Sequence, residues 1–192
     1  MKDKFKKDLK NDRITDIEIV ERYISFGSPY IFQSNESLYY DLKKDISSHF
    51  NEEIKNIIMI GSAKLGFSIA PSKLWKNFND DSDIDIAIIS EKLFDEYWKD
   101  LFEFNIELCD RTEEEEEKYN KFLRYFFKGW LRPDLFPKRF NKKSLWFDYL
   151  HSISYKKYGP YKITCAMYKN TFFFNSYHLS NVKNIRKGDL NG

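Results

Sequence analysis

Cysteine is scarce in this chain of 192 residues, with only Cys109 and Cys165 present. The two lie far apart and show neither Cys-x-x-Cys nor Cys/His spacing, which argues against a disulfide framework and a structural zinc site. We expect both to be small, buried side chains in a reducing compartment.

Long apolar runs are lacking as well. No stretch approaches the roughly 18 consecutive apolar residues that a membrane-spanning helix requires, so we expect no membrane insertion. Residues 1–13 are mostly charged and contain no apolar segment of the kind that forms a secretory signal. We therefore expect a cytoplasmic protein.

The chain also lacks a strong charge of one sign. Lys and Arg total 32 against 30 Asp and Glu, a net charge of +2, which excludes a protein that coats a polyanion with a uniformly basic surface. Hydrophobic residues make up 42% of the chain and aromatic residues 18%, which is enough for a core. Because there is no Gly/Ser/Pro-rich linker and no internal repeat, we expect residues 1–192 to form one domain.

Hydrophobic spacing divides this domain into three parts. Apolar residues at helical spacing before and after Asn35 predict N-terminal helices over 14–50. A core region over 54–110 contains two short, Ile-rich strands, 57–60 and 83–89, joined by a helical turn and a polar loop. A helix follows the second strand.

The third part, 112–187, is predicted to be helical with one late strand. Thr112 followed by Glu115 is a capping-box pattern, so a helix is expected to begin there. The remaining elements are predicted as a helix, an alternating strand and a final helix, over 143–155, 161–169 and 171–186. This order predicts an α+β or mixed α/β fold with a small sheet.

Two acids inside the second strand carry the strongest chemical signal. Side chains alternate between the faces of a strand, so Asp83 and Asp85 project from one face while the Ile residues between and after them project from the other. Two adjacent carboxylates repel each other unless a cation lies between them. Hard oxygen ligands of this kind suit Mg²⁺ or Mn²⁺.

A second signal follows the first strand directly. Gly61 allows the backbone to approach a ligand closely, and the Ser62 hydroxyl with the N–H groups of the following turn suits a phosphate oxygen. A phosphate-binding turn on one strand and a metal-binding pair on its neighbour together predict a nucleoside triphosphate site. Each motif alone is also found in ordinary turns.

The strings IIMIGS over 57–62 and SDIDI over 82–86 resemble the signature of the DNA polymerase β-type nucleotidyltransferase superfamily. That signature begins with an apolar residue, a Gly, and a Gly or Ser. After a spacer, two acids follow that alternate with apolar residues. The resemblance implies an α+β, nucleotidyltransferase-like fold: a small mixed sheet flanked by helices. It implies two divalent metals, Mg²⁺ or Mn²⁺, bound by Asp83 and Asp85. It further implies that Gly61 and Ser62 hold triphosphate oxygens.

Basic residues near the phosphates would complete such a site. Lys64 is our candidate for nucleotide binding; the other basic candidates are Lys73, Arg132, Lys138 and Arg139. The loop between the two motifs is longer than in the smallest members of the superfamily. It either covers the nucleotide or decorates the surface, and the sequence leaves both interpretations open.

A third carboxylate on a later strand usually assists deprotonation of the acceptor in active members. The late strand here contains no acid. Asp134 is our first candidate, followed by Asp148 and Asp110.

The wider string GSAKLGFS…DSDIDIAIIS resembles small bacterial members of the superfamily that accompany phage-defence genes, including the Hailong-type systems. That resemblance implies transfer of NMP or dNMP, with ATP or dATP favoured, to a hydroxyl acceptor. The product would be a nucleotide or oligonucleotide signal for an effector protein encoded nearby. Two alternatives stay open: a toxin- or antitoxin-type transferase that modifies tRNA or a partner protein, and a non-catalytic nucleotide-binding module.

Overall fold

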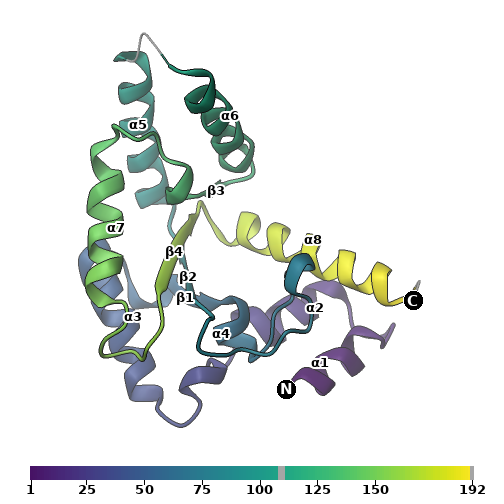
Figure 1. Ribbon diagram of the computed structural model, residues 1–192. Coiled ribbons are helices and arrows are strands. Elements are labelled where there is room, and N and C mark those ends of the chain that lie inside the picture. Colours follow the sequence, from purple (N-terminus) through teal and green to yellow (C-terminus); the bar gives the residue numbers. More distant parts are fainter. Residues whose placement is uncertain (108–110, 191–192) are drawn as a thin grey trace.

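A four-stranded mixed sheet forms the centre of the molecule (Figure 1). The computed structural model describes residues 1–107 and 111–190. The strands lie in the order β1-β2-β4-β3, and their bounds are Ile57–Ile60 (β1), Ile84–Ile89 (β2), Trp130–Leu131 (β3) and Ile163–Tyr168 (β4). β2 runs antiparallel to β1 and parallel to β4, while β3 runs antiparallel to β4.

Helices make up most of the rest of the described chain, so the fold is α+β. The eight α-helices found there are α1 (Lys2–Leu9), α2 (Asp16–Val20), α3 (Glu36–Phe50), α4 (Gly61–Leu65), α5 (Glu91–Glu107), α6 (Glu113–Phe127), α7 (Asn141–Ile153) and α8 (Thr171–Leu190). A π-helical turn, Glu21–Ser25, continues α2, and short 3₁₀ turns occupy Tyr30–Phe32, Ile54–Asn56, Pro71–Lys73 and Pro133–Leu135.

Side-chain caps fix the starts of several helices. The Thr112 side chain accepts from the Glu115 backbone N–H, and the Glu115 carboxylate accepts from Thr112 N–H, so the predicted capping box of α6 is confirmed. The side chain of Asn35 caps α3 by accepting from the Leu38 backbone N–H. Both helices therefore begin where the sequence predicts.

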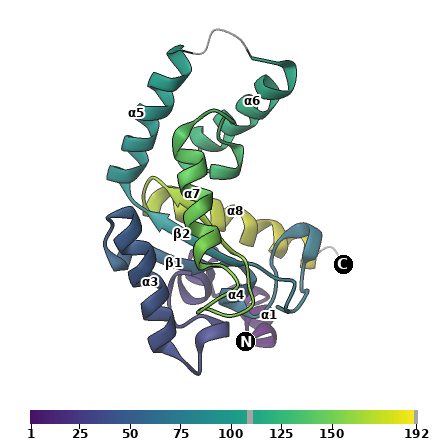
Figure 2. The same cartoon turned by 60° about the vertical axis from the view of Figure 1, so that its left-hand side comes forward.

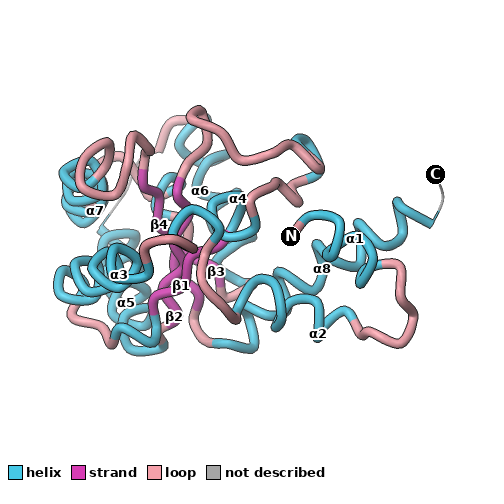
Figure 3. The backbone as a smooth tube through the Cα atoms, turned by 90° about the horizontal axis from the view of Figure 1, so that it is seen from below, coloured by secondary structure: helices cyan, strands magenta, loops and turns pink. Residues whose placement is uncertain are grey.

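The two faces of the sheet pack against different groups of helices. One face buries Ile84, Ile86 and Ile88 of β2 against α3, α5, α6 and α7. The other face buries Ala87 and Tyr168 against α1, α2 and α8. Figure 3 shows the strands between α3, α5 and α7 on the left and α1, α2 and α8 on the right. In Figure 2, α5 and α6 lie toward the top of the view and α3 toward the lower left.

The last helix returns to the first part of the chain. Arg186 of α8 pairs with Asp16 at the start of α2 at 2.7 Å, and its guanidinium also donates to the Ile14 carbonyl. Figure 1 accordingly shows α8 extending away from the sheet beside α2. This face of the sheet is therefore covered by elements from both ends of the described chain.

The predicted strands and helices are confirmed, and the structure adds two elements, the helix α1 and the strand β3. β3 escaped prediction because two residues are too few to show a period of two. The predicted helix over 143–155 begins two residues earlier, and the predicted strand over 161–169 is shorter. Within the described residues no helix is long and apolar enough to cross a membrane.

Candidate active site

The turn from β1 into α4 lies against Asp85 of β2. Ile60, the last residue of β1, is the register partner of Asp85, so the chain leaves β1 directly beside that carboxylate. Gly61 turns the chain with φ +69°, and a Cβ atom added there would lie 2.6 Å from Asp85 Oδ2. Gly61 is therefore required both by its left-handed backbone and by the close approach of the carboxylate. The two predicted motifs meet at this contact.

The carboxylate of Asp85 is held from the other side by β4. Thr164 is its register partner there, and Thr164 Oγ1 donates a hydrogen bond of 2.6 Å to Asp85 Oδ1. Burial raises the pKa of Asp85, and the negative charge of Asp83 acts in the same direction. The Thr164 hydrogen bond and the charges of Lys73 and Lys162 lower this pKa in part.

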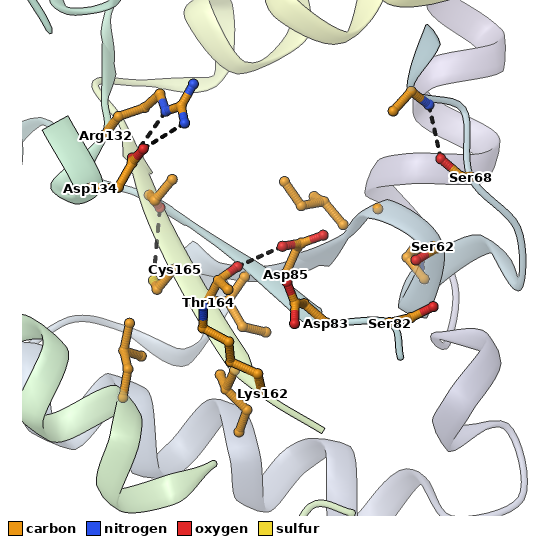
Figure 4. Close-up of a pocket in the computed structure, with 18 of the residues that line it drawn as sticks. Ser62, Ser68, Ser82, Asp83, Asp85, Arg132, Asp134, Lys162, Thr164 and Cys165 are labelled. Carbon is orange, nitrogen blue, oxygen red and sulfur yellow. Dashed lines mark hydrogen bonds and ion pairs between the residues drawn. The ribbon is translucent and has the colours of Figure 1, made fainter. Parts of the chain in front are cut away.

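Asp83 precedes β2 and is exposed. The alternation predicted for the pair is confirmed, because Ile84 and Ile86 pack into the core on the opposite face. The turn before Asp83 is fixed by Ser82, whose hydroxyl donates to Asn79 Oδ1 and accepts from the Asn79 backbone N–H. Figure 4 shows both carboxylates projecting toward the same space.

That space is a cleft of about 1040 Å³. Gly61, Ser62, Asp83 and Asp85 all line it, so the structure gathers these four predicted site residues at one cavity. Figure 4 labels the last three of them. The long loop between the two motifs also borders the cleft, through Ile69, Ala70, Pro71, Lys73, Lys76 and Asn77 among others.

Lys64, the predicted nucleotide-binding lysine, lines the cleft but is only 3% exposed. Its ammonium donates to the carbonyl oxygens of Phe26, at 2.7 Å, and Gly27. Burial lowers the pKa of Lys64 to about 8, and the charge of Lys43 acts in the same direction. The structure thus uses Lys64 to hold the segment after α2, and contact with a nucleotide would require the ammonium to leave these carbonyls.

The other predicted basic residues divide into two groups. Lys73 and Arg132 line the cleft, and so does Lys162, which the sequence did not single out. Lys138 and Arg139 instead border a separate, small hollow beside α6. The cleft therefore offers positive charge from the long loop, from the segment after β3 and from the start of β4.

The candidates for a third carboxylate have different surroundings in the structure. Asp134 lines the cleft but forms a bidentate ion pair with Arg132, at 2.7 and 3.1 Å. Asp148 on α7 also lines the cleft and is exposed. Asp110 lies outside the described residues. On β4 itself, the position directly beside Asp85 holds Thr164 instead of an acid.

The two aspartates fit a hard divalent cation, since they offer two carboxylates on one face with one of them partly desolvated. Within the described chain no group of three or more His, Cys, Asp or Glu side chains could hold a metal ion. A Mg²⁺ ion typically uses one or two carboxylates and completes its shell with water and substrate phosphate. Asp83 and Asp85 are thus enough for such an ion only together with a phosphate-bearing ligand.

The sequence did not single out Thr164 and Ser82 as parts of this site. The signal for Thr164 is its place in an alternating strand, but only the β2–β4 register shows that it faces Asp85. Comparisons with protein-family models, with curated proteins and with solved structures find no significant match.

Proposed function

We propose that this chain is a metal-dependent nucleotidyltransferase that moves NMP or dNMP from a nucleoside triphosphate to a hydroxyl acceptor and releases pyrophosphate. The contact between Gly61 and Asp85 carries the proposal, because it joins a phosphate-binding turn to a metal-binding pair at one cleft. The α+β fold, with its small mixed sheet, is compatible with the nucleotidyltransferase-like fold that the motifs suggest.

The carboxylates, the turn after β1 and two lysines of the cleft would have distinct roles in this reaction. Asp83 and Asp85 would hold divalent ions, which supply charge neutralisation at the phosphates when bound. Ser62 and the backbone after Gly61 orient triphosphate oxygens, while Lys73 and Lys162 add positive charge from the rim. The acceptor oxygen forms a bond to the α-phosphorus, the bond from that phosphorus to the bridging oxygen breaks, and pyrophosphate leaves.

The acceptor proton needs a base in this scheme. Arg132 holds Asp134 in a bidentate pair, which lowers its suitability as a base. Asp148, exposed at the cleft, is therefore the better of the two described candidates. We propose that Asp148 or solvent takes the proton.

The biological role follows from the resemblance alone. A nucleotide or oligonucleotide signal in antiviral defence, made from ATP or dATP and read by an effector encoded nearby, is our preferred role. A toxin- or antitoxin-type transferase would use the same chemistry on tRNA or a partner protein.

A non-catalytic nucleotide-binding module is the second candidate, favoured by one observation. Thr164 occupies the position on β4 directly beside Asp85, so this strand supplies no third acid there. Such a module would bind triphosphates at the same cleft without turnover.

The test measures pyrophosphate release from each NTP and dNTP with Mg²⁺ or Mn²⁺, with the intact mass of the protein read in parallel. We expect release by the wild type and none by Asp83→Ala or Asp85→Ala, with the fold intact because removal of one of two repelling acids does not unfold a strand. Turnover retained in both variants would contradict the metal-binding assignment. Metal-dependent binding of triphosphates without release would establish the binding module instead.

A further inference from the structure

A cluster of aromatic side chains lines one end of the same cleft. Trp130 of β3 lies parallel to Tyr168 of β4, with ring centroids 5.7 Å apart, and Tyr177 of α8 packs on Trp130 at 4.4 Å. His178 completes the cluster with its ring 6.2 Å from that of Tyr168 and 5.1 Å from that of Tyr177. All four residues line the cleft that contains Asp85.

This cluster concentrates buried polar atoms that have no hydrogen-bond partner. Eight such side-chain atoms occur among the described residues, and four of them are Trp130 Nε1, Tyr168 Oη, His178 Nδ1 and His178 Nε2. Tyr168 is 0% exposed and His178 is 4% exposed. Folded proteins pair nearly all buried polar groups, so a concentration of this kind needs an explanation such as water or a ligand.

The cluster offers both hydrogen-bond donors and hydrogen-bond acceptors. Trp130 offers one donor, and the Tyr168 hydroxyl can donate or accept. Burial lowers the pKa of His178 to about 4, so its ring is neutral near pH 7, with one N–H donor and one acceptor nitrogen. A partner must therefore present both donors and acceptors along one edge, and a flat partner could stack on the neighbouring rings.

The sheet order places this cluster on a definite side of Asp85. β1, which leads into Gly61, lies on one side of β2, whereas β4 and β3, which carry Tyr168 and Trp130, lie on the other. Figure 4 shows Ser62 on one side of Asp85, and Thr164 and Arg132 on the other. If the triphosphate occupies the Gly61 side, an in-line acceptor approaches from the side of the cluster.

We propose that Trp130, Tyr168 and His178 form a subsite for a nucleobase. Their polar atoms would recognise the base through hydrogen bonds to its edge. The inference rests on the proposed nucleotidyl transfer for its setting, and the position of the cluster assigns the base to a nucleoside acceptor. A nucleobase is the group that fits, because it is flat and carries donors and acceptors together at its edge. A sugar or a phosphate offers no flat aromatic ring to stack on these side chains.

The test compares folding stability with ligand binding in Tyr168→Phe, which removes a single hydroxyl. If that hydroxyl is unpaired in the free protein, its loss leaves the melting temperature unchanged or raises it. The same variant should bind at least one of AMP, GMP, CMP and UMP about twofold to tenfold more weakly by calorimetry, the value of one neutral hydrogen bond. Trp130→Phe, which removes a different donor, should weaken binding similarly.

Two controls separate the subsite from general effects. Tyr40→Phe makes the same chemical change at an exposed position on α3 outside the cleft and should alter neither quantity. Ribose 5-phosphate, which has no base, should bind the wild type and Tyr168→Phe equally. A lower melting temperature of Tyr168→Phe with unchanged affinity for all four monophosphates would show that ordered water fills the cluster, and would overturn the proposal.

Competition identifies the source of the base. An acceptor base is expected to bind together with a triphosphate, whereas displacement of the monophosphate by the triphosphate would assign the subsite to the donor nucleotide. The outcomes also separate this inference from the proposed function. Weaker monophosphate binding in Tyr168→Phe, with no pyrophosphate release by the wild type, supports the subsite and removes the transfer. If the wild type releases pyrophosphate but Tyr168→Phe binds monophosphates as tightly as the wild type, the transfer is supported and the subsite is refuted.

Discussion

Substitution of Gly61 by Ala tests the contact that joins the two motifs. The residue has φ +69°, where a side chain is strained, and the added Cβ would lie 2.6 Å from Asp85 Oδ2. Gly27 provides a matched control, because it has φ +77° with no atom within 4 Å of an added Cβ. Gly27→Ala therefore introduces the backbone strain alone, whereas Gly61→Ala adds the displacement of the carboxylate.

The magnitudes follow from these two effects. The left-handed conformation costs an L-residue roughly 1–2 kcal/mol, so each variant should lose about that much unfolding free energy. Displacing Asp85 also breaks its 2.6 Å hydrogen bond from Thr164, and a hydrogen bond to a charged group contributes about 1.5–3 kcal/mol. Gly61→Ala should therefore be less stable than Gly27→Ala by about 1.5–3 kcal/mol, or roughly 3–12 °C in melting temperature.

Urea denaturation of four variants and the wild type isolates the contact between Gly61 and Asp85. Gly61→Ala, Gly27→Ala, Asp85→Ala and the double variant Gly61→Ala/Asp85→Ala are unfolded in urea and compared with the wild type. Without the carboxylate, the extra cost at Gly61 should disappear, which appears as a coupling between the two substitutions. Equal destabilisation by the two glycine variants, or additive effects of Gly61→Ala and Asp85→Ala, would refute the close approach.

Three further substitutions test other parts of the account. Thr164→Val removes a hydrogen bond that lowers the pKa of Asp85, so the acidic limb of the pH–activity profile should move to higher pH, whereas Thr171→Val at an exposed position should leave it in place. Lys64→Met tests the buried ammonium: burial lowers the pKa of Lys64 from 10.5 to about 8, so the unfolded chain binds more protons between these values. The wild type should therefore gain stability relative to Lys64→Met as pH rises from 8 to 10.5, by up to about 3 kcal/mol, and a flat difference in urea melts would contradict the burial. Ser90→Ala removes the hydroxyl that accepts from the third backbone N–H of α5 and should lower the unfolding free energy by about 1 kcal/mol; an unchanged urea midpoint would remove the cap assignment.

Alternation and capping made much of the fold predictable. The apolar run over 57–60 and the Ile residues of 84–88 identified two strands and the face on which the acids lie, and Asn35 and Thr112 marked two helix starts. These signals are local, since each depends on a few neighbouring residues. Cys165 is buried in the core as expected, and its burial raises the pKa of the thiol, whereas Cys109 lies outside the described residues.

Features that depend on distant residues could not be predicted in this way. The pairing of Asp85 with Thr164 depends on the parallel register of β2 and β4, which are separated by more than 70 residues. The burial of Lys64 depends on carbonyls at Phe26 and Gly27, and nothing in its own segment indicates them. The aromatic cluster around His178 likewise combines β3, β4 and α8.

The fate of the α-phosphate tests the central proposal most directly. Each nucleoside triphosphate is supplied with label on the α- or the γ-phosphate, and with Mg²⁺ or Mn²⁺, to the wild type and to Asp83→Ala. Nucleotidyl transfer predicts that the α-label enters a product or the protein while the γ-label leaves as pyrophosphate, and that both signals are lost in Asp83→Ala. Release of the γ-label as inorganic phosphate, or α-label transfer that persists in Asp83→Ala, would contradict the proposal.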